Sequence, residues 1–123
     1  MAHFAKVNSE NVVEEVLVVP DEQEDRGQEF LANDLGLGGT WIQTSYNTYE
    51  NVHNDGGTPL RGNYATIGGT YDADNDIFLP PKLYDSWTLN VSDARYDPPT
   101  PHPGDDLYEW NEETLSWDLV TYD

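Results

Sequence analysis

Residues 71–78 read YDADNDIF, and residues 110–117 read WNEETLSW. In both stretches two aromatic residues stand seven positions apart and enclose a short segment rich in acids and amides. Asp and Asn stabilise tight turns through side-chain to backbone hydrogen bonds, and aromatic residues on the two arms of a hairpin pack across the strand pair. Both stretches therefore predict an antiparallel β-hairpin with an aromatic residue on each arm. The segment NSEN at residues 8–11 is a weaker third case.

The N-terminal part is predicted to hold one hairpin and one helix. Residues 3–20 place strand-favouring runs on both sides of the NSEN turn, the second of them rich in β-branched valines. Pro20 ends the second run because proline cannot donate to a strand ladder. Residues 22–35 carry acids at the start and an apolar stripe at the end, which predicts a short helix. Gly27 is expected to weaken the middle of this helix by about 1 kcal/mol. Residues 40–49 predict a further strand.

Two segments are predicted to lie outside the sheets. Residues 50–63 are almost all turn formers and predict a mobile surface loop. Residues 97–106 contain four prolines and predict an extended, unpaired spacer.

The expected fold class is α+β, mainly β, with short antiparallel hairpins or a meander and one short helix. A single domain is expected over residues 1–123, with a β-hairpin plus helix at 1–46, a loop at 47–63, and aromatic hairpins at 64–123 that include the spacer. The expected core consists of ten residues: Phe4, Val16, Val18, Phe30, Leu31, Leu35, Trp41, Ile42, Phe78 and Trp87.

Net charge and composition exclude several classes of partner. The chain has 24 acidic and 5 basic residues and a formal charge of −19, so it is expected to repel nucleic acid and anionic membranes. It has no cysteine, which excludes a disulfide framework, a thiol nucleophile and cysteine-bound zinc. No apolar run approaches the roughly 20 residues of a membrane span, and the first residues lack the apolar region of a signal peptide. Aromatic residues make up 12% of the chain, which favours a folded but core-poor domain that gains stability by association.

No pattern of catalytic residues is present in the sequence. Asp72, Asp74 and Asp76 resemble the first half of an EF-hand loop, but loop positions six and twelve hold Ile77 and Leu83. The stretch therefore predicts a turn, and the three aspartates remain weak candidates for a cation site. The three histidines are isolated from one another and from any nucleophile motif. Neither an enzymatic activity nor a cofactor is expected.

The aromatic residues outside the expected core are candidates for an interface. Tyr and Trp are enriched at binding hot spots, and they also form platforms that bind sugars. Core filling, subunit contacts and sugar binding all remain open for this set. The interface candidates are Tyr46, Tyr49, Tyr64, Tyr84, Trp87, Tyr96, Tyr108, Trp110 and Trp117.

Four stretches together resemble a family of small proteins of marine tailed bacteriophages, notably those that infect cyanobacteria. The stretches lie in the same order as in that family, at residues 1–19, 27–47, 61–90 and 108–117. Family members are described as virion structural or tail-associated proteins, and the family has no catalytic motif. This chain departs from the family pattern in a longer loop at residues 47–63 and in the segment VSDARYD after Asn90, where a tryptophan-containing segment is usual.

The resemblance implies a non-enzymatic virion structural protein that decorates or cements the particle exterior, with the capsid as the first expectation. A module of the tail, neck or fibre is one alternative, and a glycan-binding module for host attachment is another. The implied partners are other virion proteins and further copies of the chain, as a homo-oligomer in the assembled particle. The implied location is the virion, assembled in the host cytoplasm.

Overall fold

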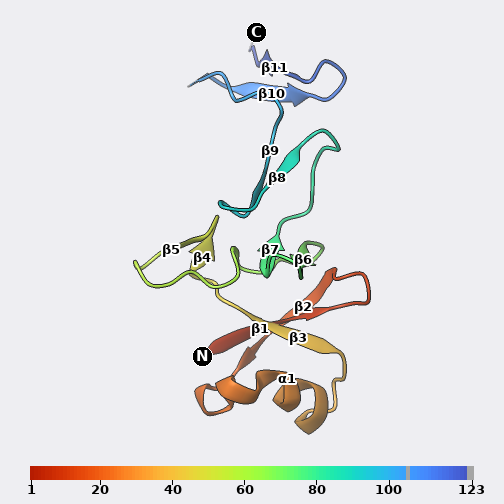
Figure 1. The fold of residues 1–123 in the computed structure, drawn as a ribbon, viewed down its shortest axis with the longest axis vertical. Helices are drawn as coiled ribbons and strands as arrows, with labels where there is room; N and C mark the ends of the chain where they lie inside the picture. The colour runs from red at the N-terminus through yellow and green to blue at the C-terminus, as the bar shows by residue number, and fades with distance from the viewer. Residues whose placement is uncertain (105, 122–123) are drawn as a thin grey trace.

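The structure is a computed structural model that describes residues 1–104 and 106–121. Strands account for 36% of the residues and helices for 12%, and the strands form short antiparallel pairs. This confirms the expected mainly β fold with one short helix. The chain extends from a sheet-and-helix part at the N-terminal end to a series of hairpins at the C-terminal end (Figure 1).

The N-terminal sheet has three antiparallel strands in the order β2-β1-β3. Their bounds are Ala2–Val7 for β1, Val13–Val19 for β2 and Thr40–Thr44 for β3. The turn between β1 and β2 is held by Asn8, whose Oδ1 accepts hydrogen bonds from the backbone N–H of Glu10 and Val12 at 2.8 and 3.0 Å. The predicted hairpin at the NSEN turn is therefore confirmed.

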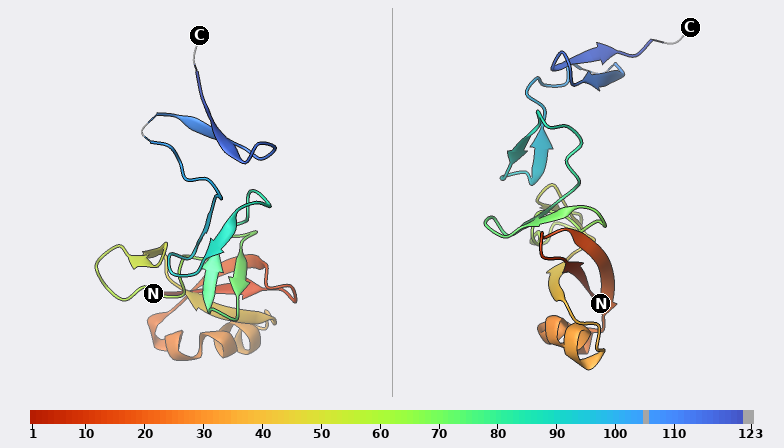
Figure 2. Two further views of the ribbon diagram at one scale, coloured as in Figure 1. Left: turned by 45° about the horizontal axis from the view of Figure 1, so that its top comes forward. Right: turned by 90° about the vertical axis from the view of Figure 1, so that its right-hand side faces the viewer.

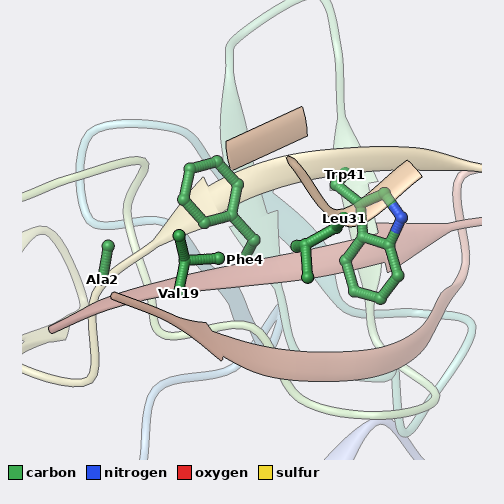
Figure 3. Close-up of a cluster of buried hydrophobic side chains, with 5 residues drawn as sticks. All are labelled: Ala2, Phe4, Val19, Leu31 and Trp41. Atoms are coloured by element: carbon green, nitrogen blue, oxygen red, sulfur yellow. The ribbon is translucent and has the colours of Figure 1, made fainter. Parts of the chain in front are cut away.

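One helical segment covers a face of this sheet. It begins with 3-10 geometry at η1 (Asp21–Arg26), continues as α1 (Gly27–Glu29) and ends with π geometry at η2 (Phe30–Asp34). Below it lies a cluster of buried side chains shown in Figure 3, made of Ala2, Phe4, Val19, Leu31 and Trp41.

Gly27 has a packing role in this cluster. A Cβ atom at Gly27 would overlap the aromatic ring of Phe4, so the missing side chain lets the ring lie directly against the helix backbone. The loss of helix propensity at Gly27 is thus offset by the close approach of helix and sheet.

The opposite face of the sheet is covered by residues from the middle of the chain. Its buried cluster consists of Ala5, Val7, Val13, Ala65 and Phe78. Val16, Ile42 and Tyr71 pack against this cluster and are partly buried. The sheet is therefore covered on both faces.

Three hairpins follow one another towards the C-terminus (Figures 1 and 2). The first pairs β6 (Thr70–Asp72) with β7 (Ile77–Leu79), and the third pairs β10 (Tyr108–Asn111) with β11 (Ser116–Leu119). Tyr71 lies opposite Phe78, and Trp110 lies opposite Trp117, as predicted. The second hairpin pairs β8 (Thr88–Asn90) with β9 (Arg95–Asp97), and the sequence analysis did not identify it.

The three hairpins share one turn geometry. The residue that begins each turn accepts a hydrogen bond from a backbone N–H within the turn through its side-chain Oδ1, at 3.0–3.1 Å; these residues are Asp72, Asn90 and Asn111. The residue that ends each turn has a positive φ between 50° and 55°; these residues are Asp76, Ala94 and Leu115. Two of the three also carry a side-chain bond across the hairpin, from Asn90 Nδ2 to Asp97 at 2.9 Å and from Asn111 Nδ2 to Asp118 at 3.0 Å.

The segment predicted as a mobile loop, residues 50–63, is exposed over most of residues 51–58 but is ordered by contacts at its two ends. It contains the short strand β5 (Val52–His53), which pairs with β4 (Thr48–Tyr49) just before it. The side chains of Thr48 and Asn63 are buried. The prediction of a surface loop over residues 50–63 is therefore wrong at its C-terminal end. The residues do form turns, as their composition predicted. Hydrogen bonds to the buried side chains of Thr48 and Asn63 hold these turns in place.

Asn63 connects three parts of the chain through its carboxamide. Its Nδ2 donates to the carbonyl oxygens of Phe78 and Ala94 at 2.8 and 2.7 Å, and its Oδ1 accepts from the backbone N–H of Glu50 at 2.8 Å. The carbonyl oxygen of Asn63 accepts from the hydroxyl of Thr44 at 3.3 Å. The first two hairpins and the β4–β5 turn are thus fixed to one side chain next to the N-terminal sheet.

Two of the ten predicted core residues are wrong. Val18 is 47% exposed because it lies at the end of the edge strand β2, beyond the part of that face where Val16 packs. Leu35 is 53% exposed because it follows the end of the helical segment. Four of the others are buried, namely Phe4, Leu31, Trp41 and Phe78. The remaining four are partly buried: Val16, Phe30, Ile42 and Trp87.

The proline-rich spacer carries no strand over residues 98–104, as predicted. Asp97 belongs to β9, and Asp105 lies outside the described residues. The prolines therefore connect the second and third hairpins without entering a sheet.

Asn63→Ala is expected to lower the free energy of unfolding by about 1–3 kcal/mol for each carbonyl that loses its buried donor. Asn54→Ala is the matched control, because Asn54 is exposed and its change should stay within about 0.5 kcal/mol. Urea unfolding monitored by circular dichroism measures both variants. Equal stability of the two variants would contradict the role of Asn63.

Gly27→Ala is expected to destabilise the protein by about 1–3 kcal/mol, because a methyl group would force the Phe4 ring out of its packing position. Helix propensity alone predicts the opposite sign, a gain of up to about 1 kcal/mol. The sign of the shift in thermal midpoint decides between the two. Asp25→Ala, at an exposed position of the same segment, is the control.

Candidate functional site

Four aromatic side chains form a cluster between the second and third hairpins, which we call the tryptophan cluster: Tyr84, Trp87, Trp110 and Trp117. The ring centroids of Trp87, Trp110 and Trp117 lie 5.1–6.2 Å apart in edge-to-face arrangements, and Tyr84 lies 5.5 Å from Trp87. Only Trp110 is buried, and the other three are partly exposed. Such aromatic pairs each contribute about 0.5–1.5 kcal/mol beyond area burial, so the cluster joins the two hairpins.

Glu112 ties this cluster to the segment before β8. Its carboxylate accepts hydrogen bonds from the backbone N–H and the hydroxyl of Ser86 at 3.1 and 2.6 Å, and from the indole N–H of Trp110 at 2.8 Å. The bonds from Ser86, followed by the bond from Trp110, lower the pKa of Glu112 because they stabilise the ionised form.

The proline-rich spacer lies against the third hairpin. The indole N–H of Trp117 donates to the carbonyl oxygen of Thr100 at 2.8 Å, and the hydroxyl of Thr100 donates to the carbonyl oxygen of Leu115 at 2.9 Å. The ring of His102 packs edge-on against Trp117 with centroids 4.9 Å apart. The spacer bends at Pro99 and Thr100 and is attached to the third hairpin at Thr100.

A cavity of about 440 Å³ lies beside this contact, lined by Trp87, Arg95, Asp97, Pro98, Pro101, His102 and Trp117. Arg95 donates to Asp97 at 2.7 Å. Hydrogen bonds from Asn90 and Arg95 lower the pKa of Asp97, so this carboxylate is committed to its own hairpin. The indole N–H of Trp87 is buried and has no hydrogen-bond partner among the described residues.

A second aromatic group lies at β4, and we call it the tyrosine pocket: Tyr46, Thr48, Tyr49, Asn63, Tyr64, Thr66 and Pro80. These residues line a cavity of about 250 Å³. Tyr46 and Tyr49 are 61% and 67% exposed. The ring of His3 packs edge-on against two tyrosines of the pocket, with centroid distances of 5.2 Å to Tyr46 and 5.8 Å to Tyr64.

The structure thus sorts seven of the nine interface candidates into two groups. Tyr84, Trp87, Trp110 and Trp117 meet in the tryptophan cluster, while Tyr46, Tyr49 and Tyr64 meet in the tyrosine pocket. Tyr96 and Tyr108 lie outside both groups, where Tyr96 is 5.7 Å from the ammonium of Lys82 and Tyr108 is 5.4 Å from the ring of His102.

Two of the three aspartates of the first hairpin, Asp72 and Asp76, have structural partners for their carboxylates. Asp72 holds the turn, with its Oδ1 accepting from the N–H of Asp74 and Asn75. Asp76 accepts from Arg61 Nε at 2.8 Å and from the hydroxyl of Tyr71, and these two bonds lower its pKa. Within residues 1–104 and 106–121, no group of three or more His, Cys, Asp or Glu side chains could hold a metal ion.

A further cavity, of about 500 Å³, lies between the helical segment and β3. Both arginines in its lining are already paired, Arg26 with Asp34 and Arg61 with Asp76, at 2.8 Å in each case. The imidazole of His53 accepts backbone N–H groups of its own turn. These cationic and imidazole groups are therefore already engaged within the chain.

No model of a known protein family matches the chain, and neither curated proteins nor solved structures give a match. Among the described helices, none has the length and apolar character that crossing a membrane requires.

Glu112→Gln is expected to destabilise the third hairpin at neutral pH, because the ionised carboxylate is the better acceptor for Ser86 and Trp110. A depressed pKa means that this stabilisation is present above the unfolded-state pKa of about 4.3 and is lost as the pH falls through the lower folded-state pKa. The difference in thermal midpoint between wild type and variant should therefore shrink below about pH 4.

Glu113→Gln is the matched control, because it removes the same charge from the same turn at an exposed position. Tryptophan fluorescence against temperature, recorded from pH 7 down to pH 3, reports on both variants. A constant difference between wild type and Glu112→Gln across this range would refute the role of the ionised carboxylate.

Proposed function

We propose that the chain is a non-enzymatic structural protein of a tailed-phage particle that decorates the particle exterior, with the capsid as its location, through protein–protein contacts. The resemblance of residues 1–19, 27–47, 61–90 and 108–117 to small virion proteins supports the particle as the setting. The hairpin architecture supports binding to other proteins.

The observation that carries this proposal is the series of separate two-stranded hairpins. The second and third hairpins pair only with themselves, whereas the first also forms a β-bridge from Thr70 to Val12. An isolated two-stranded hairpin is marginally stable in water. The rings between the second and third hairpins are mostly half-exposed. A protein surface that covered these rings would supply the apolar burial that the hairpins lack.

The net charge of −19 fits a component needed in many copies. Negative charge keeps free copies apart and soluble until a specific surface captures them. Salt screens this repulsion once copies lie side by side on a particle.

A tail, neck or fibre module rests on the same features and differs from a capsid component in copy number. A glycan-binding attachment module draws its support from the exposed rings of Tyr46 and Tyr49. The test must therefore measure whether the chain is present in the particle, how many copies each particle holds, and whether the chain binds a glycan.

The test is quantitative mass spectrometry of purified particles of the phage that encodes the chain. Hundreds of copies per particle are expected for the capsid, and a small multiple of three or six would indicate the tail. Absence of the chain from purified particles would overturn the proposal. Binding of labelled wild-type chain to particles made without it, with an equally acidic unrelated protein as control, separates specific capture from charge effects.

A further inference from the structure

We propose that the outer edge of β2, at Val16 and Val18, binds an extended, positively charged segment of a different protein, which adds to the N-terminal sheet as a fourth strand. In this binding mode the main chain of the partner supplies the hydrogen bonds, and its alternate side chains supply the selectivity. The site is separate from the tryptophan cluster and its test uses a peptide, so its failure would leave the particle assignment to the particle measurement.

The N-terminal sheet has two edge strands, and side chains already cover one of them. That covered edge is β3. The backbone N–H of Trp41 donates to Oε1 of Gln28. The carbonyl oxygen of Gln43 accepts from the guanidinium of Arg61 at 3.1 Å. A further strand could pair with β3 only by displacing these side chains, so β3 is closed to strand addition.

The register of the sheet shows which backbone groups of β2 face outward. Opposite residues of an antiparallel pair exchange both hydrogen bonds or neither, and successive residues alternate between the two sides of a strand. Because the carbonyl oxygen of Gln43 faces outward, Phe4, which lies opposite on β1, directs its backbone groups towards β2. Its partner there is Leu17. Val16 and Val18, on either side of Leu17, therefore direct their backbone groups away from the sheet.

The outward groups of Val16 and Val18 are free within residues 1–104 and 106–121. The only strand that pairs with β2 is β1, and neither valine makes a backbone hydrogen bond outside the sheet. In the right-hand view of Figure 2, β2 is the outermost strand on its side of the sheet. Two N–H and two C=O groups therefore remain available to an added strand.

The chain itself already pairs with this edge at the start of β2. The backbone N–H of Val13 donates to the carbonyl oxygen of Gly69 at 2.9 Å, and the carbonyl oxygen of Val13 accepts from the N–H of Gly68 at 2.9 Å. A β-bridge joins Val12 to Thr70. This pairing ends at Val13, and an added strand would continue it along the rest of β2.

The side chains along the edge favour a basic partner. Glu14 and Glu15 are exposed and belong to none of the ion pairs of the described residues. Opposite charges on facing strands stabilise a pair, and like charges destabilise it. The partner strand is therefore expected to carry Lys or Arg beside the two glutamates and apolar residues beside Val16 and Val18.

The net charge favours a different protein over a second copy as the occupant. Two chains with a charge of −19 each repel one another, and β2 has no Lys or Arg to place beside the glutamates of a second β2. The same charge attracts a positively charged partner and raises its rate of encounter.

The experiment uses the full chain labelled with ¹⁵N and two capped synthetic peptides. The basic peptide is Lys-Thr-Val-Thr-Val-Lys, and the acidic peptide has Glu in place of Lys. In the free chain at low concentration, the amide protons of Val16 and Val18 are expected to exchange at least about tenfold faster than that of Leu17. The basic peptide at about 1 mM should slow their exchange about tenfold, and the acidic peptide should not.

Two variants and one control test the edge. Val18→Pro removes an outward N–H that has no partner in the chain, and edge strands tolerate proline at such positions, so the peptide should be lost while the circular dichroism spectrum is kept. The second variant, Glu14→Lys with Glu15→Lys, leaves the backbone intact and should abolish the preference for the basic peptide. The control, Glu109→Lys with Glu113→Lys, changes the net charge equally at exposed positions of the third hairpin and should keep that preference.

Four outcomes would overturn the inference. The first is slow amide exchange at Val16 and Val18 in the free monomer, which would mean that the edge is covered. The second is no protection by the basic peptide up to about 1 mM, the weak limit of specific affinities. The third is equal protection by both peptides. The fourth is a dimer of the free chain that protects the two valines, which would assign the edge to a second copy.

Discussion

The three hydrogen bonds of the Asn63 carboxamide hold the arrangement of the whole chain. Its two amide protons are directed at carbonyls of the first and second hairpins, and its oxygen receives the N–H of Glu50. An aspartate would lack both donors, and an alanine would leave the carbonyls unpaired in a buried site. Thr44 and Thr48, the other buried polar residues, bond to the backbone around Asn63. Buried polar bonds thus supply the fixed geometry that a small apolar core cannot supply alone.

Beyond Asn63, each hairpin is stabilised by its own turn and by contacts with the hairpin next to it in the chain. Each hairpin closes its own turn with an Asp or Asn side chain and a residue of positive φ. The third hairpin is attached to the second by aromatic rings, by Glu112 and by the bond from Trp117 to Thr100. The proline spacer is therefore part of the third hairpin's support as well as a connection. Stability at the C-terminal end depends on these few side chains.

The sequence predicts the fold where a pattern is local. The seven-residue spacing of aromatic residues found the first and third hairpins, and the apolar stripe found the helix. The second hairpin has the same spacing between Leu89 and Tyr96, and a Pro-Pro pair follows both it and the first hairpin; a search restricted to aromatic pairs missed it because Leu89 is aliphatic. The burial of Asn63 has no local signal, since it depends on carbonyls that fold back from Phe78 and Ala94. The same holds for Gly27, where the reason for a glycine is a ring 23 positions away in the sequence, at Phe4. The interface candidates were found by residue type, but their division into two groups required the structure.

The separation of the hairpins into independent strand pairs has an evolutionary consequence. No strand of the first, second or third hairpin pairs with a strand of another. The third hairpin together with its proline linker is thus an insertion unit whose gain or loss leaves every strand register in the rest of the chain unchanged, whereas the first two hairpins are fixed to Asn63. The C-terminal end can therefore change in length by this unit while the N-terminal sheet keeps its sequence.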